Sequence, residues 1–333
     1  MFATAQNPTS LNSYVGFDTV TQQIERKFLK RGFNFNIILV GETGLGKSTL
    51  LNTIFSAHLM DSKGRKSAVE APRQTVDITP VTHLVEEKGV KMRLTIVDTP
   101  GYADQVNNDQ CWKPIVKYIT DQHRAYLERE TAPSRDRFIP DTRVHCCLYF
   151  ISPSGHSLKA LDIEVLRHLT QVVNVVPVIA KADSLTPEER TAFKRRIKEE
   201  LTYHKINVYP YASEEDDDSD KSLLQEIKTL TPFSVVGSEN VYEVSGKVIR
   251  GRRHRWGVID VEDVNHCDFV HLRNFLTRTH LHDLVETTAH IHYETFRYSC
   301  LNSPSNTAPN SVPPTSPMAI DHQHIVNGTN QMA

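Results

Sequence analysis

The segment from Ile38 to Leu50, ILVGETGLGKSTL, constrains the fold more than any other part of this 333-residue chain. It fits the pattern G-x-x-x-x-G-K-[ST], and it lies directly between an apolar run and a pattern typical of a helix. Glycines let the backbone curl, so that successive N–H groups point at phosphate oxygens near the positive end of the following helix. The segment therefore predicts a phosphate-binding loop that joins a buried strand to a helix.

The side chains of this loop predict a nucleoside triphosphate site with a magnesium ion. Lys47 would reach the β- and γ-phosphates, and the Ser48 hydroxyl would bind Mg²⁺. A structural alternative is a glycine-rich turn that only connects two elements, but it leaves the Lys-Ser pair and both flanks unexplained. The other contacts to the nucleotide would come from Gly41, Gly44, Leu45, Gly46 and Thr49.

A second motif, TIVDTPG, lies about fifty residues after the loop, at the end of an apolar strand. Asp98 is placed to bind Mg²⁺ through water, and the backbone N–H of Gly101 could reach the γ-phosphate. Asp-Thr-Pro-Gly also makes a good turn, so the motif alone is not specific. Its order and spacing behind the loop favour the functional interpretation.

The third motif, AKAD at 180–183, again follows an apolar strand. The Asp183 carboxylate can accept hydrogen bonds from N1–H and N2–H of guanine, donors that adenine lacks, while the stem of Lys181 packs along the ring. In isolation the tetrapeptide could equally be a solvated turn. Behind the other two motifs it predicts that the base is guanine, and it argues against an ATP-dependent enzyme.

Short β-branched runs alternate with charged amphipathic segments, which is typical of strand–helix units around a sheet. The clearest predicted strands are 33–41, 92–101, 144–152 and 175–183. They show little polar alternation, as expected for a mostly parallel sheet with helices on both faces. Glu87-Lys88-Gly89 predicts a hairpin that makes one strand antiparallel. Helices are expected at 48–58, 104–130, 157–171, 186–204 and 268–297.

Three further segments are distinct in pattern or composition. The acidic run at 214–220 is expected to be a solvated loop, because it lacks the ordered ligand spacing of a metal site. From about Leu301 the chain is rich in Ser, Pro and Asn and has no heptad pattern, which predicts a disordered tail without a coiled coil. The last predicted helix carries an apolar stripe that we expect to be buried: Phe269, Leu272, Leu276 and Leu284.

The composition is ordinary for a globular protein, with 39% apolar residues, 23% charged residues and a net charge of -2. The five cysteines lack the paired spacing of zinc ligands or of a disulfide framework, so we expect reduced thiols in a cytosolic protein. No signal-peptide pattern begins the sequence, and the apolar runs are too short to span a bilayer. Any membrane contact would therefore be peripheral.

Taken together, these motifs resemble those of the septins, GTP-binding proteins that polymerise into filaments. The resemblance covers roughly residues 14–298, and within the family the sequence is most similar to the short fungal core septin that lacks a coiled coil. The matching blocks stand in septin order: YVGF, GETGLGKSTLLN, RLTIVDTPGY, RVHCCLYFISPSGH, PVIAKAD, PFSVVGSEN, GRRHRWGV and DFVHLRNFLTRTHLHDLVETT.

The resemblance implies an α/β fold, namely a Ras-like three-layer α/β/α GTPase domain of the P-loop NTPase class with a septin unique element. That element is absent from ordinary small GTPases. The implied divisions are an N-terminal extension with a polybasic helix (1–30), the GTPase domain core (31–237), the septin unique element and last helix packed on that core (238–300), and a disordered tail (301–333).

The resemblance also assigns residues that spacing alone would not. It implies a base pocket completed by Gly237 and by Arg252, whose guanidinium can lie flat against guanine. His156 and Glu189 would reach the nucleotide of a facing subunit, and Trp256 would lie in the nucleotide-side (G) interface. Taken alone, these last three residues read as a loop histidine, a helix-surface glutamate and a core tryptophan.

Hydrolysis of GTP is expected to be slow. Small GTPases use a glutamine directly after D-x-x-G to orient water, and this chain has Tyr102 there. In hydrolytically active septins a switch threonine binds Mg²⁺ and orients water, and Thr75 falls on that position, although Thr79 lies one turn away and Thr75 could simply open a strand. Septins usually read DTPGYGD, whereas this chain has Ala103, which restricts the backbone. We therefore expect a mainly structural GTP or GDP.

The segment QIERKFLKRGF places four basic residues among apolar ones, a pattern that suits anionic lipid headgroups. A charge run is more commonly just a solvated helix face. Septins carry a polybasic first helix at this position, proposed to bind phosphoinositides near the second (NC) interface. The basic residues are Arg26, Lys27, Lys30 and Arg31.

The leading prediction is a septin that assembles with other septins into hetero-oligomers and filaments, through the nucleotide-side and NC interfaces. The family implies a place in the cytoplasm and cytoskeleton, at the cell cortex and the division septum or bud neck, where septins scaffold cytokinesis. Anionic membranes are the other expected partner, and nucleic acid is not expected. The alternative is a regulatory GTPase that acts as a monomeric switch, and the septin-like segment after Gly237 argues against it.

Overall fold

The computed structural model describes residues 19–60, 78–99, 110–134, 138–211, 218–244 and 246–302. Its main sheet has six strands in the order β2-β3-β1-β4-β5-β6. Among the described strands of this sheet only β2, at one edge, is antiparallel to its neighbour. The strands are β1 (Phe33–Gly41), β2 (Thr79–Glu87), β3 (Val90–Asp98), β4 (Cys146–Ile151), β5 (Val175–Ile179) and β6 (Phe233–Ser234).

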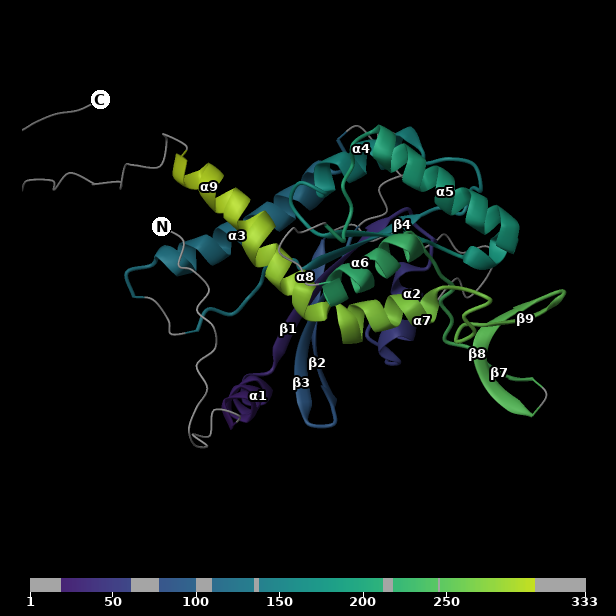
Figure 1. Ribbon diagram of the computed structural model, residues 1–333, viewed down its shortest axis with the longest axis horizontal. Helices are drawn as coiled ribbons and strands as arrows, with labels where there is room; N and C mark the ends of the chain where they lie inside the picture. Colours follow the sequence, from purple (N-terminus) through teal and green to yellow (C-terminus); the bar gives the residue numbers. More distant parts are fainter. Residues whose placement is uncertain are drawn as a thin grey trace, which may run out of the picture.

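The sequence of β1 explains why the sheet carries helices on both faces (Figure 1). Successive side chains of a strand point to opposite faces. Phe35, Ile37 and Leu39 lie in one buried cluster, whereas Ile38 and Val40 lie in the other. The predicted three-layer α/β/α fold with a mostly parallel sheet is confirmed. One face is covered by α2 (Lys47–Phe55), α6 (Asp218–Leu230), α7 (Phe269–Asn274) and α8 (Leu281–Thr287), and the other by α3 (Lys113–Thr131), α4 (Ala160–Leu169) and α5 (Pro187–Tyr203).

The predicted hairpin at 87–89 is confirmed as the connection between β2 and β3. Lys88 and Gly89 both have positive φ, 50° and 83°, which is the backbone of a tight turn whose twist matches that of the strands. The hydroxyls of Thr82 and Thr95 lie 3.1 Å apart in directly opposed positions of the two strands. The two-residue turn therefore fixes the register of β2 against β3.

The last predicted helix, 268–297, is not continuous as expected. His280 has φ −119° and ψ 11°, and it separates α7 and a π-helical turn (Phe275–Thr279) from α8, a second π-helical turn (Thr288–Tyr293) and α9 (Glu294–Asn302). The break allows the ring of His280 to pack against those of Phe275 and Tyr209. The apolar period runs through the break, so periodicity could not reveal it. The expected stripe is buried: Phe269, Leu272, Leu276 and Leu284 are each 0% exposed.

The acidic run at 214–220 was expected to be a loop throughout, but its last residues begin helix α6 at Asp218. The helix is stabilised because Ile227 and Leu230, three residues apart, lie on one face and pack against the core. The described part of the chain contains no group of three or more metal-ligating side chains. Residues 212–217 lie outside the described residues, as do residues 303–333 of the predicted tail.

A second, three-stranded antiparallel sheet projects from the body of the molecule (Figure 1). Its strands are β7 (Val241–Val244), β8 (Lys247–His254) and β9 (Gly257–Asp260). A Cβ atom at Gly251 would lie 2.0 Å from the carbonyl oxygen of Ile259, so only glycine fits where β8 meets β9. Ser238 Oγ donates to the Gly251 carbonyl at 2.5 Å and anchors this sheet to the segment that follows β6.

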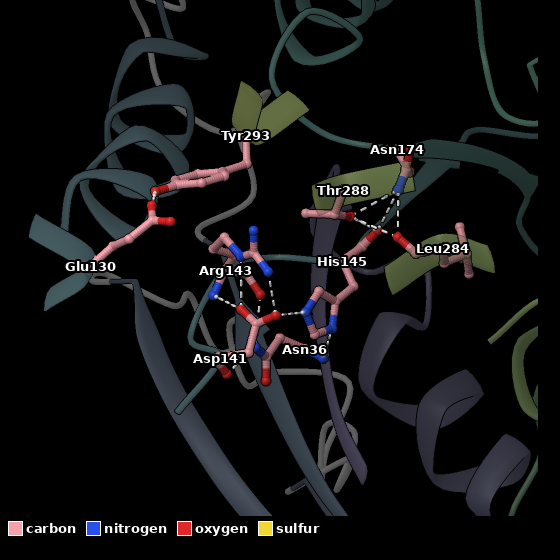
Figure 2. Close-up of polar contacts among 9 residues, drawn as sticks. All are labelled: Asn36, Glu130, Asp141, Arg143, His145, Asn174, Leu284, Thr288 and Tyr293. Carbon is pink, nitrogen blue, oxygen red and sulfur yellow. Dashed lines mark hydrogen bonds and ion pairs between the residues drawn. The ribbon is translucent and has the colours of Figure 1, made fainter. Parts of the chain in front are cut away.

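A buried polar network ties the C-terminal helices to the amino-terminal ends of β4 and β5 (Figure 2). Arg143 donates to Asp141 at 2.9 and 2.7 Å, and its guanidinium lies 4.9 Å from the ring centre of Tyr293. Asn174 Nδ2 donates to the Thr288 hydroxyl at 3.0 Å. Burial alone would raise the pKa of Asp141, but hydrogen bonds from His145 and Arg143 outweigh it and hold that pKa well below its usual range.

Helix α1 (Thr19–Arg31) precedes β1 and contains the predicted polybasic segment. Each of the five cysteines lies in the described residues as a free thiol, as expected. Among the described helices none has the length and apolarity needed to cross a bilayer.

Candidate functional site

The carboxyl ends of β1, β3, β4 and β5 meet at one edge of the main sheet, because these strands run parallel. Ligands of open α/β sheets bind at this edge. The phosphate-loop motif follows β1, Asp98 ends β3, and the AKAD motif follows β5. The topology thus brings the three motifs together although they are far apart in sequence.

The loop between β1 and α2 owes its shape to glycines. Gly44 and Gly46 have φ of 80° and 88°, which favours glycine, and Gly46 is the residue before the first turn of α2. A Cβ atom at Gly41 would lie 2.7 Å from Cβ of Phe150, so the loop passes too close to β4 for a side chain. Gly44 and Gly46 are therefore favoured by their positive φ, and Gly41 is required because a side chain there would clash with β4.

Lys47 is buried and folds back across the loop. Its Nζ donates to the carbonyl oxygens of Gly41 and Glu42, each at 3.0 Å. The side chain of Glu42 forms an ion pair with Lys159, which precedes α4. The loop is thereby held from both sides, with the Lys47 ammonium at its centre and Ser48 and Thr49 in the first turn of α2.

A cavity of about 460 Å³ adjoins this loop. It brings together predicted residues of the phosphate loop with Lys181, Gly237 and Arg252. A Cβ atom at Gly237 would lie 2.9 Å from Cα of Leu50, so this glycine lets the segment before the second sheet pass against α2. The lining residues that the sequence did not predict as ligands are Leu50, Phe150, Ala180, Val235, Ser238, Glu239 and Asn240.

Asp183 lies in the 3₁₀ turn after β5 and does not itself line the cavity, and its side chain is only 3% exposed. Arg252 Nη1 lies 3.0 and 2.9 Å from its two carboxylate oxygens. His254 Nε2 lies 2.8 Å from Oδ2. The sequence predicted Arg252 as a contact to the base but did not predict His254. The one feature of the sequence that could have indicated His254 is its position two residues after Arg252, which puts both side chains on one face of the strand.

The predicted residues at the β3 end are only partly within the described residues. Asp98 pairs in register with Leu39 of β1, and Thr99 Oγ1 donates to the Leu39 carbonyl at 2.8 Å. Asp98 therefore lies beside the start of the phosphate loop. Thr75, Gly101, Tyr102 and Ala103 lie outside the described residues.

His156 and Glu189 lie in segments that follow β4 and β5, and neither lines the cavity. His156 is exposed in its loop. Glu189 caps α5: its carboxylate accepts from the Thr186 backbone N–H at 2.9 Å, and its own N–H donates to the Thr186 hydroxyl at 3.3 Å. Hydrogen bonds from Thr186 lower the pKa of Glu189.

Trp256 lies in the turn between β8 and β9 and is 76% exposed. The interpretation of this residue as a core tryptophan is therefore wrong. Its ring stacks on that of His254, with centroids 5.1 Å apart and planes 4° apart. Tryptophan is enriched among the residues that contribute most to binding at protein interfaces.

The Septin family profile matches residues 31–310, which is most of the chain. The chain belongs to the septin family. It is 58% identical over 294 residues to septin homolog spn2 of Schizosaccharomyces pombe, covering 88% of this chain and 89% of that protein. It is 51% identical over 286 residues to cell division control protein 10 of Saccharomyces cerevisiae, covering 86% and 89%. This septin thus resembles fungal septins over nearly their whole length.

The fold comparison agrees with the family. The crystal structure of the septin GTPase domain from Chlamydomonas reinhardtii superimposes with a TM-score of 0.61 at 27% identity, covering 80% of this chain and 98% of that one. Membership of the family implies binding of guanine nucleotide and assembly with other septins. The Saccharomyces cerevisiae relative is named for the control of cell division.

Proposed function

We propose that this septin holds a guanine nucleotide as a structural part of a filament subunit. The observation that carries the proposal is the ion pair between Arg252, which lines the cavity from the second sheet, and Asp183, in the turn that follows β5 of the main sheet. A nucleotide in this cavity would contact both sheets. Its presence would therefore fix the projecting sheet and its exposed Trp256 relative to the body of the molecule.

The roles of individual residues follow from their places. The loop residues Gly44 and Gly46 direct backbone N–H groups at the phosphates. The Lys47 ammonium gives up its hydrogen bonds to the Gly41 and Glu42 carbonyls and neutralises the phosphate charge instead. Asp183 accepts from the edge of guanine, and Arg252 covers the ring. Backbone contacts from Gly41, Leu45, Thr49, Gly101 and Gly237 complete the proposed site.

The oxygen ligands of the site fit Mg²⁺. Ser48 lies in the first turn of α2, which follows β1, and Asp98 is the last residue of β3. Because β1 and β3 are direct neighbours, the two residues lie at the same edge of the sheet. Hydroxyl and carboxylate oxygens are the ligands that this hard cation prefers. A bound Mg²⁺ would supply charge to the phosphates during hydrolysis. We propose Thr75 as a third ligand and as the residue that orients water, with slow turnover because Tyr102 replaces the usual glutamine.

Three exposed residues form the proposed nucleotide-side interface. They are His156, Glu189 and Trp256, which lie in three different segments of the chain. On a facing subunit they would approach the neighbouring nucleotide. Helix α1, at the other end of β1, would serve the NC interface and an anionic, phosphoinositide-containing membrane through its exposed basic residues.

Two such surfaces on one subunit generate open chains rather than closed dimers. We also propose that 31–237 forms the nucleotide-binding core and 238–300 the septin unique element with its packed helices. The relatives named for cell division support a place at the cortex of the division site, in a bud neck or septum.

Sedimentation velocity of the chain with its septin partners tests the filament proposal. At low salt we expect polymers that shift to short oligomers at high salt, because exposed charges are screened. W256A should reduce assembly at low salt while leaving the unfolding midpoint unchanged, since this side chain is mostly exposed. Monomers at every salt concentration would refute the proposal.

A further inference from the structure

His254 contacts the carboxylate that the proposed site uses for the base. Its Nε2 is a buried atom 2.8 Å from Asp183 Oδ2, although its ring N–H is not aligned with that oxygen in this structure. Asp183 is 3% exposed, so little water competes for its oxygens. In such a low-dielectric site a nearby donor strongly influences how a carboxylate is oriented.

Two features hold the imidazole in this place. His254 and Arg252 are two residues apart on β8, so their side chains leave the strand on the same face and approach Asp183 together. On its other side the imidazole stacks on the indole of Trp256. The position of the imidazole is therefore set by the backbone of β8, which carries it, and by the indole stacked against it.

Arg252 and His254 differ in how many acceptor positions of the Asp183 carboxylate they leave available for a bound base. A carboxylate has about four lone-pair positions, so Oδ2 can hold His254 and still accept a hydrogen bond from guanine. Arg252 contacts both oxygens, at 3.0 and 2.9 Å, and must release at least one of them when the base binds there. His254 contacts Oδ2 alone, so it can remain in place.

We propose that His254 is a positioning residue for guanine selectivity, holding the Asp183 carboxylate in the orientation that accepts both N1–H and N2–H of the base. The inference rests on the proposed guanine site. Hypoxanthine lacks the 2-amino group and makes only the N1–H contact. If the Asp183 carboxylate turns so that it no longer accepts from N2–H, the protein loses affinity for guanine, while its affinity for hypoxanthine stays nearly unchanged.

The experiment compares GDP with IDP in the full-length chain after its nucleotide has been removed with excess EDTA. Each competes with a ribose-labelled fluorescent GDP. H254F keeps an aromatic ring beside Trp256 but removes the donor, and H254L removes both. H254Q keeps an N–H donor of similar reach. We expect the GDP to IDP affinity ratio to fall at least fivefold in H254F and H254L, and to stay within twofold of wild type in H254Q.

A purely structural role would lower both affinities together and leave the ratio unchanged. The proposal is overturned if H254F and H254L keep the wild-type ratio, or if H254Q loses it as completely as they do. The guanine site itself is tested separately. D183N should shift preference from GDP to XDP, whose C2 carbonyl accepts from an amide N–H. Equal binding of GDP and ADP by the wild-type chain would refute that site whatever His254 does.

Discussion

The side-chain amide of Asn52 donates a 2.6 Å hydrogen bond to Glu239 Oε1 and so joins helix α2 to the wall of the cavity. The same nitrogen donates to the Met60 carbonyl at 2.8 Å. The amide oxygen accepts from the backbone N–H groups of Leu59 and Met60, at 3.0 and 2.9 Å. Asn52 is 3% exposed and uses its full hydrogen-bonding capacity. It therefore couples the phosphate-loop helix, the segment after that helix, and the approach to the second sheet.

N52D tests this coupling with almost no change in volume. The substitution replaces two donors by a carboxylate beside Glu239, so we expect a loss of about 1–3 kcal/mol in the free energy of unfolding. Release of bound GDP should also accelerate, because the cavity wall loses its tie to α2. Urea unfolding and a fluorescent GDP release assay measure the two effects.

The double variant N52D/E239Q provides the matched control. The glutamine amide can donate to the new carboxylate, so part of the lost stability should return. If E239Q instead adds its own loss to that of N52D, the two side chains do not act as a pair.

Single-turnover GTP hydrolysis tests the proposed role of Thr75. T75A should lower the rate at least tenfold, because it removes a ligand of Mg²⁺ and a group that orients water. T79A changes the neighbouring candidate and should alter the rate less than twofold. Equal rates for T75A and wild type would remove Thr75 from the mechanism, and a reversed pattern would assign the role to Thr79.

Two buried histidines predict that the protein loses stability in mild acid. Burial lowers the pKa of His123 and of His292 to about 4 from the ordinary 6.5. Between pH 6.5 and 4 the unfolded chain therefore binds more protons than the folded one, and the free energy of unfolding falls as the pH falls. The slope is at most about 1.4 kcal/mol per pH unit for each histidine. Above pH 6.5 neither histidine contributes to it.

H292Q tests the assignment of this slope. Nε2 of His292 lies 3.0 Å from Asn174 Oδ1, and a glutamine amide can make the same hydrogen bond without titrating. Urea unfolding at pH 7.0 and 5.0 should show a clearly smaller pH dependence than wild type. H290Q, at an exposed position of the same helical segment, should leave the dependence unchanged. An unaltered slope in H292Q would contradict the assignment.

The basic face of α1 predicts binding to anionic membranes. Arg26, Lys27 and Lys30 are exposed, and Arg31 is exposed with its guanidinium 4.8 Å from the ring centre of Phe138. Each cation near a charged surface contributes about 1 kcal/mol. Replacing all four by alanine should therefore weaken binding to phosphoinositide-containing liposomes at least tenfold.

The control for that experiment replaces four exposed basic residues of α3, namely Lys113, Lys117, Arg124 and Arg129. It removes the same charge from another surface and should leave liposome binding within about threefold. Equal losses in both variants would show that only net charge matters. No loss in the α1 variant would refute the membrane surface.

Much of the fold could be predicted from local pattern. The phosphate loop, the hairpin at Lys88-Gly89 and the strands of the parallel sheet each have a period or a turn residue with one clear structural meaning. The order of those strands then places the three motifs at one sheet edge without further information. The predicted ends of α2, α4 and α5 differ from the observed ones by a few residues, because helix ends depend on capping contacts.

The remaining features depend on contacts between distant residues. Arg252 reaches Asp183 across 69 residues of sequence, and His254 follows it, so neither contact has a local signal. The exposure of Trp256 depends on the turn between two strands of a projecting sheet. The break at His280 depends on rings from other segments that pack against it. A resemblance to the family could supply Arg252 and Trp256, but it could not supply His254.

The most direct test of the central claim is to denature freshly purified protein and identify the released nucleotide by ion-pair chromatography, quantified per chain. We predict near-stoichiometric guanine nucleotide, because residues of both sheets, Phe150 and Arg252, line the cavity and a retained ligand would stabilise their contact. The ratio of GDP to GTP would report hydrolysis by this subunit. An empty protein, or one that releases adenine nucleotide, would contradict the account.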